Sequence, residues 1–163
     1  MFREMRRKKQ ALPAEENFRI LEQGTSGVLA VAGDSGFPYA VPMSYVYEDG
    51  KIYFHCAKSG HKLDAVKRNE KVSFCVIAQD RVVPEAYTTY FRSVIVFGYA
   101  RVLEEEGEIR GAIEKLAVKY APGDAPGRER EIEKQLPALC MVELTIAHMT
   151  GKEAKELSRE RPD

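Results

Sequence analysis

The spacing of apolar residues changes along the chain from a helical period to a strand-like one. Residues 13–23 repeat apolar positions at helical spacing and stop before Gly24, which predicts a first helix. From Gly27 onward, short apolar runs alternate with turn residues. The expected strands are residues 27–32, 39–47, 52–56, 71–78, 91–103 and 140–146. The turns between the first three are too short for a crossover helix, so these strands form an antiparallel meander.

Three further segments have helical rather than strand-like character. Residues 61–69 and 128–135 predict short helices, and residues 109–120 predict an amphipathic helix with Ile113, Leu116, Ala117 and Tyr120 on its apolar face. Within the strand 91–103, Gly98 indicates a bulge or bend. The six strands do not alternate with helices. The chain is therefore expected to be mainly β, an antiparallel barrel with peripheral helices.

Length and charge narrow the class of protein. A chain of 163 residues fits one domain with one core, which we assign to residues 13–158. The basic residues 1–12 are expected to form a flexible arm, and residues 159–163 a flexible tail. Lysine and arginine total 25, as do aspartate and glutamate, so the net charge gives no reason to expect nucleic acid or an anionic membrane as partner.

Membrane insertion and secretion find no support in the hydropathy pattern. No stretch approaches the roughly 20 apolar residues that a membrane helix needs. The basic N-terminal residues are not followed by the apolar segment of a secretory signal. A cytoplasmic location is therefore expected.

The chain has three cysteines, Cys56, Cys75 and Cys140, each within an apolar run and none in a C-x-x-C motif. Buried free thiols in a reducing cytoplasm are the expected state. Cys56 follows His55, and His61 comes five residues later, but a metal site needs further ligands that nothing nearby supplies. No metal is expected.

A candidate anion site lies at the junction of residues 59–62. The sequence lacks a G-x-G-x-x-G motif and a complete P-loop. At this junction, however, Gly60 lets the backbone approach a ligand, and the first amides of the following helix have no partners within the helix. Ser59, His61 and Lys62 add a hydroxyl, an imidazole and an ammonium, a set that could clamp a phosphate. The alternative is an ordinary helix start capped by Ser59, with Lys62 solvated.

Two histidines follow apolar runs. His55 ends a strand beside the candidate anion site, so it could contact a substrate or act as a general acid. The competing interpretation is a hydrogen-bonded histidine at the barrel end. For His148 the structural interpretation is favoured.

Several blocks together resemble the FMN-binding split-barrel proteins, the relatives of pyridoxamine 5′-phosphate oxidase, and within them the nitroimidazole-resistance branch. The resemblance covers residues 17–157. It is carried by the blocks PYAVPMSY (38–45), IYFHCA (52–57), GHKLD (60–64), YFRSV (90–94) and MTGK (149–152).

The resemblance implies a six-stranded split barrel that dimerises and holds FMN at the subunit interface. By this resemblance, the backbone of one strand contacts the edge of the isoalloxazine ring; its residues are Val41, Pro42, Met43, Ser44 and Tyr45. The ribityl phosphate is held by Ser59, His61 and Lys62. Ser93 and Val94 complete the cofactor site.

The implied function is an FMN-dependent oxidoreductase acting on a small molecule, with a nitro-aromatic as the suggested substrate and His55 as the residue beside it. The arginine-rich substrate site of pyridoxamine phosphate oxidases is not recognisable, and no tryptophan is present to stack on a flavin. Two alternatives stay open: a flavin or haem carrier or redox sensor without turnover, and a structural barrel with an empty cleft.

Overall fold

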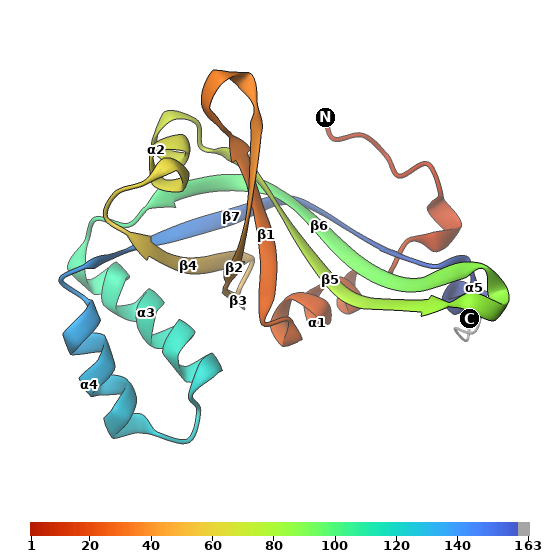
Figure 1. Ribbon diagram of the computed structural model, residues 1–163. Helices are drawn as coiled ribbons and strands as arrows, with labels where there is room; N and C mark the ends of the chain where they lie inside the picture. The colour runs from red at the N-terminus through yellow and green to blue at the C-terminus, as the bar shows by residue number, and fades with distance from the viewer. Residues whose placement is uncertain (160–163) are drawn as a thin grey trace.

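The computed structural model describes residues 1–159, which form one seven-stranded sheet and five α-helices (Figure 1). The strands are β1 (Ser26–Ala32), β2 (Pro38–Ser44), β3 (Val46–Glu48), β4 (Lys51–Ala57), β5 (Lys71–Val83), β6 (Thr88–Val102) and β7 (Leu139–Glu153). The α-helices are α1 (Ala14–Gln23), α2 (His61–Arg68), α3 (Glu106–Tyr120), α4 (Ala125–Gln135) and α5 (Lys155–Arg159). Residues 160–163 of the expected C-terminal tail lie outside the described part of the chain.

The sheet is an open antiparallel barrel. Its strand order is β2-β1-β5-β6-β7-β4-β3, and neighbouring strands all run antiparallel. The two edge strands, β2 and β3, follow each other in sequence, so the sheet curls to bring its edges near one another. Within residues 1–159 these edges do not pair, which leaves the barrel split. The expected mainly β split barrel with peripheral helices is confirmed.

The strand count of six was wrong because the expected strand 39–47 is two strands, broken at Tyr45. The Tyr45 side chain is fully buried, its hydroxyl donates to the Leu21 carbonyl at 2.8 Å, and its ring packs edge-on against Phe74 at 5.0 Å. Its backbone N–H donates to the Tyr120 hydroxyl at 3.0 Å instead of to a strand. Tyr45 therefore anchors the chain in the core where it passes from one sheet edge to the other.

β5 and β6 form an arm that is longer than the apolar pattern predicted. The run ends at Ala78, yet pairing continues through Asp80 opposite Phe91 and Arg81 opposite Tyr90. Figure 1 shows this hairpin reaching away from the barrel toward α5. The bulge predicted at Gly98 is confirmed by a register shift there, and a Cβ at Gly98 would lie 2.3 Å from the Thr145 carbonyl oxygen.

The C-terminal end of the expected N-terminal arm packs against β7. Gln10 is buried and its side-chain amide donates to the Glu153 carbonyl at 2.8 Å. The Leu12 N–H donates to the Gly151 carbonyl at 3.0 Å, and the Leu12 side chain joins the core. These contacts position α1 beside the barrel.

The apolar residues form two adjoining clusters. The larger fills the barrel, with Phe54, Phe74 and Leu29 among its fully buried side chains. The smaller lies between the outer face of the sheet and the helix pair α3–α4, around Met141 and Leu116. Figure 1 shows this pair standing below β4 and β7 at one end of the molecule, where it forms a second layer.

Candidate functional site

A cavity of about 820 Å³ lies between the helix pair and the ends of two strands. Ser44 comes from β2 and His55 from β4, while Tyr120, Arg128 and Leu139 are among the residues that close the other sides. This volume suits a small organic ligand, and a mostly apolar lining with a few polar groups is typical of such sites. We call it the α3–α4 cavity.

His55 presents its ring to this cavity. Its neighbours on β4, Phe54 and Cys56, are buried in the barrel, so the alternation of the strand turns His55 outward. Partial burial, with a further contribution from the Lys62 ammonium, lowers the pKa of the imidazole below its ordinary value of 6.5. Neutral His55 therefore predominates at pH 7, and it can donate one hydrogen bond and accept another.

The start of α2 is open, as the sequence suggested. Gly60 has φ +130°, a conformation that side-chain-bearing residues rarely adopt, and its carbonyl accepts the first helical bond from Asp64 at 3.0 Å. No side chain of residues 1–159 caps this helix, and Ser59 is exposed. The interpretation of Ser59 as an ordinary cap is therefore wrong, and the first amides of α2 stay available to a ligand.

His61 and Lys62 face different neighbours. His61 stacks on Tyr39 at 4.2 Å between ring centroids, and its Nε2 accepts from the Asp34 N–H at 3.2 Å. Arg68, from the last turn of α2, also binds Asp34, at 3.0 Å. The helix is thus tied to the β1–β2 turn, whereas Lys62 acts electrostatically on His55.

β2 forms one edge of the sheet, and its residues alternate between core and surface. Val41 and Met43 pack against the barrel core, while Pro42 and Ser44 are exposed. Met43 pairs with Gly27 at the start of β1, so it lies at the end of β2 opposite to the β1–β2 turn that binds α2. Proline has no N–H, so on an edge strand its nitrogen faces away from the neighbouring strand. Backbone N–H groups two residues apart face the same side, so the Ser44 N–H also points to the free edge of the sheet.

Ser93 and Val94 lie on β6, away from the start of α2 in the same chain. Val94 is fully buried in the barrel core, and Ser93 sits opposite Lys152 of β7. The segment after α2 meets β6 at Ala100, whose N–H donates to the Glu70 carbonyl at 2.8 Å. Ser93 is seven residues away from Ala100, which is about 23 Å of strand.

The fold therefore brings Ser44 and His55 together at the α3–α4 cavity, places Lys62 within electrostatic range of His55, and leaves Ser93 and Val94 apart from them. Sequence reasoning missed the wall made by α3 and α4. The apolar face of residues 109–120 indicated that Tyr120 points inward, but not that its hydroxyl binds the Tyr45 backbone on both sides of the strand break. Tyr45 itself is too deeply buried to stack on a ligand.

Within residues 1–159, no three histidine, cysteine, aspartate or glutamate side chains gather in a way that could hold a metal ion. Among the helices of the same residues, none has the length and apolar character needed to cross a bilayer.

An open antiparallel barrel with a cleft between its strand ends and an outer helix pair defines a split-barrel protein. The chain belongs to the pyridoxamine 5′-phosphate oxidase family, whose model matches residues 13–153. No protein with a curated description matches the sequence.

Solved structures share the fold at low sequence identity. A conserved hypothetical protein from Mycobacterium tuberculosis superposes with a TM-score of 0.82 at 18% identity, covering 98% of this chain and 95% of that one. A proposed 5-nitroimidazole antibiotic resistance protein from Bacteroides thetaiotaomicron gives 0.73 at 20%, covering 88% and 86%. An FAD-binding protein from Mesorhizobium loti gives 0.67 at 24%, covering 89% and 97%.

Proposed function

We propose that this chain binds FMN and serves as a flavin-dependent oxidoreductase for a small molecule that enters the α3–α4 cavity. The observation that carries the proposal is the open start of α2, with Lys62 beside it, next to a cavity into which His55 points. The family and the FAD-binding structural relative support a flavin as the ligand.

The junction fits a phosphate. Unpartnered amides at a helix start attract anions, and an ammonium adds a charge-assisted contact. The exposed Ser59 hydroxyl and the left-handed Gly60 lie at the same place. In this proposal Ser59 and Lys62 hold the phosphate, while His61 fixes the junction against Asp34.

The edge of β2 fits the ring system. Residues 41–45 would contact the isoalloxazine through backbone groups. Ser44 lines the α3–α4 cavity and supplies a backbone N–H at the unpaired edge of β2. Bound flavin supplies electron transfer to the substrate. The protein's own part is to orient the ring, to exclude water with Leu116 and Leu139, and to present the His55 imidazole to the substrate.

Substitution of His55 tests the catalytic part of the proposal. In His55→Ala we expect FMN to stay bound, while reoxidation of the chemically reduced flavin by a 5-nitroimidazole slows about 100-fold, the scale of a lost hydrogen-bond donor to the reacting group. Anaerobic stopped-flow absorbance measures this rate. Val118→Ala is the control, because Val118 is exposed on α3, does not line the cavity and lies outside the dimer face proposed below. An unchanged rate in His55→Ala would remove His55 from the mechanism, and loss of FMN would return it to a structural role.

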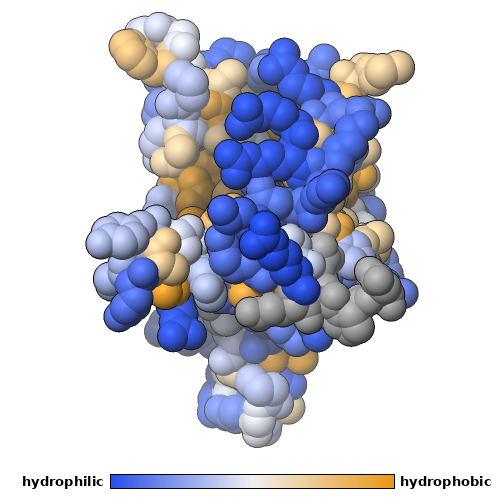
Figure 2. Space-filling view, turned by 90° about the vertical axis from the view of Figure 1, so that its right-hand side faces the viewer, coloured by the Kyte–Doolittle hydropathy of each residue, from blue (hydrophilic) through white to orange (hydrophobic). Residues whose placement is uncertain are grey.

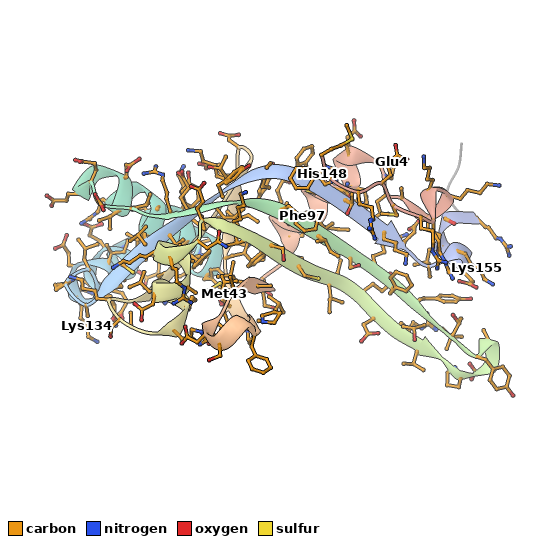
Figure 3. All side chains as sticks on the ribbon, turned by 90° about the horizontal axis from the view of Figure 1, so that it is seen from above. Glu4, Met43, Phe97, Lys134, His148 and Lys155 are labelled. Carbon is orange, nitrogen blue, oxygen red and sulfur yellow. The ribbon has the colours of Figure 1, made fainter. Side chains whose placement is uncertain are left out.

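We further propose that two copies form a homodimer through the outer face of β6, with FMN at the interface. Ile95, Phe97 and Tyr99 alternate on this face, and each exposes at least 40% of its surface. Phe2 stacks on Phe97 at 5.5 Å, and Phe97 lies beside His148 (Figure 3). An exposed apolar row of this kind is typical of an interface. Such a dimer would also let Ser93 of one copy serve the flavin of the other.

The end of the molecule that carries the hairpin arm presents a different surface. Figure 2 shows hydrophilic side chains over much of this end, with apolar side chains between them. It offers no continuous apolar face in this view, so the proposed interface is assigned to β6 rather than to the arm end.

Sedimentation equilibrium tests the dimer. The chain should sediment at twice its 18.4 kDa mass. Ile95→Glu should reduce it to a monomer, because it places a charge in an apolar contact. Val118→Glu, at an exposed apolar position on α3, should leave the dimer intact. A monomer that still binds FMN would refute the shared-interface arrangement.

A further inference from the structure

Cys56 and Cys140 face each other across two paired strands. Cys56 on β4 lies directly opposite Cys140 on β7, and their sulfur atoms are 3.1 Å apart. The third cysteine, Cys75, is on β5, which is separated from β7 by β6 in the sheet. The spacing of two strands is about 10 Å, so Cys75 cannot join this pair.

The backbone at the pair suits a disulfide. The Ile146 N–H donates to the carbonyl of Gly50, which lies opposite it, so these two residues form a hydrogen-bonded pair of the β4–β7 ladder. Hydrogen-bonded pairs recur at every second position of an antiparallel ladder. Cys56 and Cys140 are six positions further along, so they form a hydrogen-bonded pair as well. Cα atoms in such a pair are about 5.5 Å apart. That distance lies within the range of about 4.4–6.8 Å seen across disulfides, so the spacing of the two strands allows the bond.

The two thiols have different surroundings. Cys56 is only 6% exposed, and burial together with the contact to Cys140 raises its pKa. Cys140 is half-buried and opens onto a hollow of about 400 Å³ that is also lined by Lys58 and Lys67. An oxidant in this hollow reaches the Cys140 sulfur more readily than the buried Cys56 sulfur, and access is a condition for cysteine reactivity. Cys140 is thus the accessible nucleophile and Cys56 the partner behind it.

We propose that Cys140 and Cys56 form a redox-active dithiol that reacts with hydroperoxides. The Cys140 thiolate attacks the outer peroxide oxygen, the O–O bond breaks, and the leaving oxygen takes a proton to become an alcohol or water. Cys140 is then a sulfenic acid. The Cys56 sulfur attacks the Cys140 sulfur, an S–S bond forms, and the sulfenic oxygen leaves as water. Two thiols are oxidised and one peroxide is reduced, and an external dithiol restores the thiols by exchange.

This chemistry does not depend on a bound flavin. It does bear on the proposed substrate site, because Cys56 lines the α3–α4 cavity next to His55. The disulfide would cross-link the strand that carries His55 to β7. It would also close a loop of 84 residues, and restricting an unfolded chain over such a length stabilises the folded state.

Thiol counting after oxidation tests the proposal. Protein treated with one equivalent of hydrogen peroxide is denatured in N-ethylmaleimide and weighed by mass spectrometry. We expect one maleimide per chain, on Cys75, against three in untreated protein. Cleavage after lysine and arginine should then yield peptide 52–58 linked to peptide 135–152, with peptide 72–81 carrying the label. Dithiothreitol should restore all three thiols, and oxidation should raise Tm by about 5–15 °C.

Variants in which one of the three cysteines is replaced by serine sharpen the result. Cys75→Ser should lose both remaining thiols on oxidation, whereas Cys140→Ser should keep Cys56 free and form no cross-linked peptide. The proposal is overturned by three labelled thiols after oxidation, by a linked peptide that contains Cys75, or by oxygen added to Cys140 without a cross-link.

Discussion

Phe74→Ala is expected to lower the free energy of unfolding by about 3–5 kcal/mol, the cost of emptying a large aromatic site in a core. Phe74 is fully buried on β5, which pairs with β1 on one side and β6 on the other. Its ring meets the Tyr45 ring edge-on, and a Cβ at Gly27 would lie 2.3 Å from it. The site is therefore enclosed by backbone that cannot collapse onto a cavity. Urea unfolding followed by circular dichroism measures the change.

The matched control is Phe37→Ala. Phe37 lies in the β1–β2 turn and exposes 74% of its surface, so the same atoms are removed from a side chain that is already in contact with solvent. We expect a change within about 0.5 kcal/mol. For a domain of this size each kcal/mol shifts Tm by about 2–4 °C, so the two variants should differ by roughly 10 °C. Equal losses in both would mean that the barrel interior is not the main core.

Lys62→Ala is expected to weaken FMN binding tenfold or more and riboflavin binding hardly at all. The two ligands differ only in the phosphate, which we assign to the start of α2. A charge-assisted contact of this kind contributes about 1.5–3 kcal/mol, and 1.4 kcal/mol is a factor of ten in Kd. Fluorescence quenching of each flavin on titration with the protein gives both constants.

Lys58→Ala is the control for the Lys62 result. Lys58 is an exposed lysine just before the junction, and its loss should leave FMN binding nearly unchanged. Equal weakening of FMN and riboflavin by Lys62→Ala would show that Lys62 acts through folding. An unchanged FMN constant would place the phosphate at another cation, such as Lys152 opposite Ser93.

The strands of the barrel could be predicted because their apolar runs are separated by turn residues. The turn at Asp49 and Gly50 is an example: both have positive φ, at 48° and 78°, as a two-residue hairpin turn requires. The break at Tyr45 could not be predicted, because the residues on either side continue the alternation. The length of the arm was missed for a related reason, since the polar residues Asp80 and Arg81 pair through backbone groups alone.

The candidate site was predictable only where its parts are close in sequence. Gly60 and Lys62 were found together because a loop-to-helix junction is a local feature. Their relation to Ser44 and His55 depends on how β2 and β4 end against α3 and α4, which no local pattern encodes. Cys56 and Cys140 are 84 residues apart, and only the register of β4 against β7 brings them into contact.

The central claim is that this chain is an FMN protein, and the visible absorbance spectrum of the purified protein tests it most directly when the released cofactor is weighed by mass spectrometry. We predict flavin absorbance bands and the mass of FMN, at one molecule per chain. A protein that is colourless as purified, and that remains colourless after incubation with FMN and gel filtration, would contradict the claim.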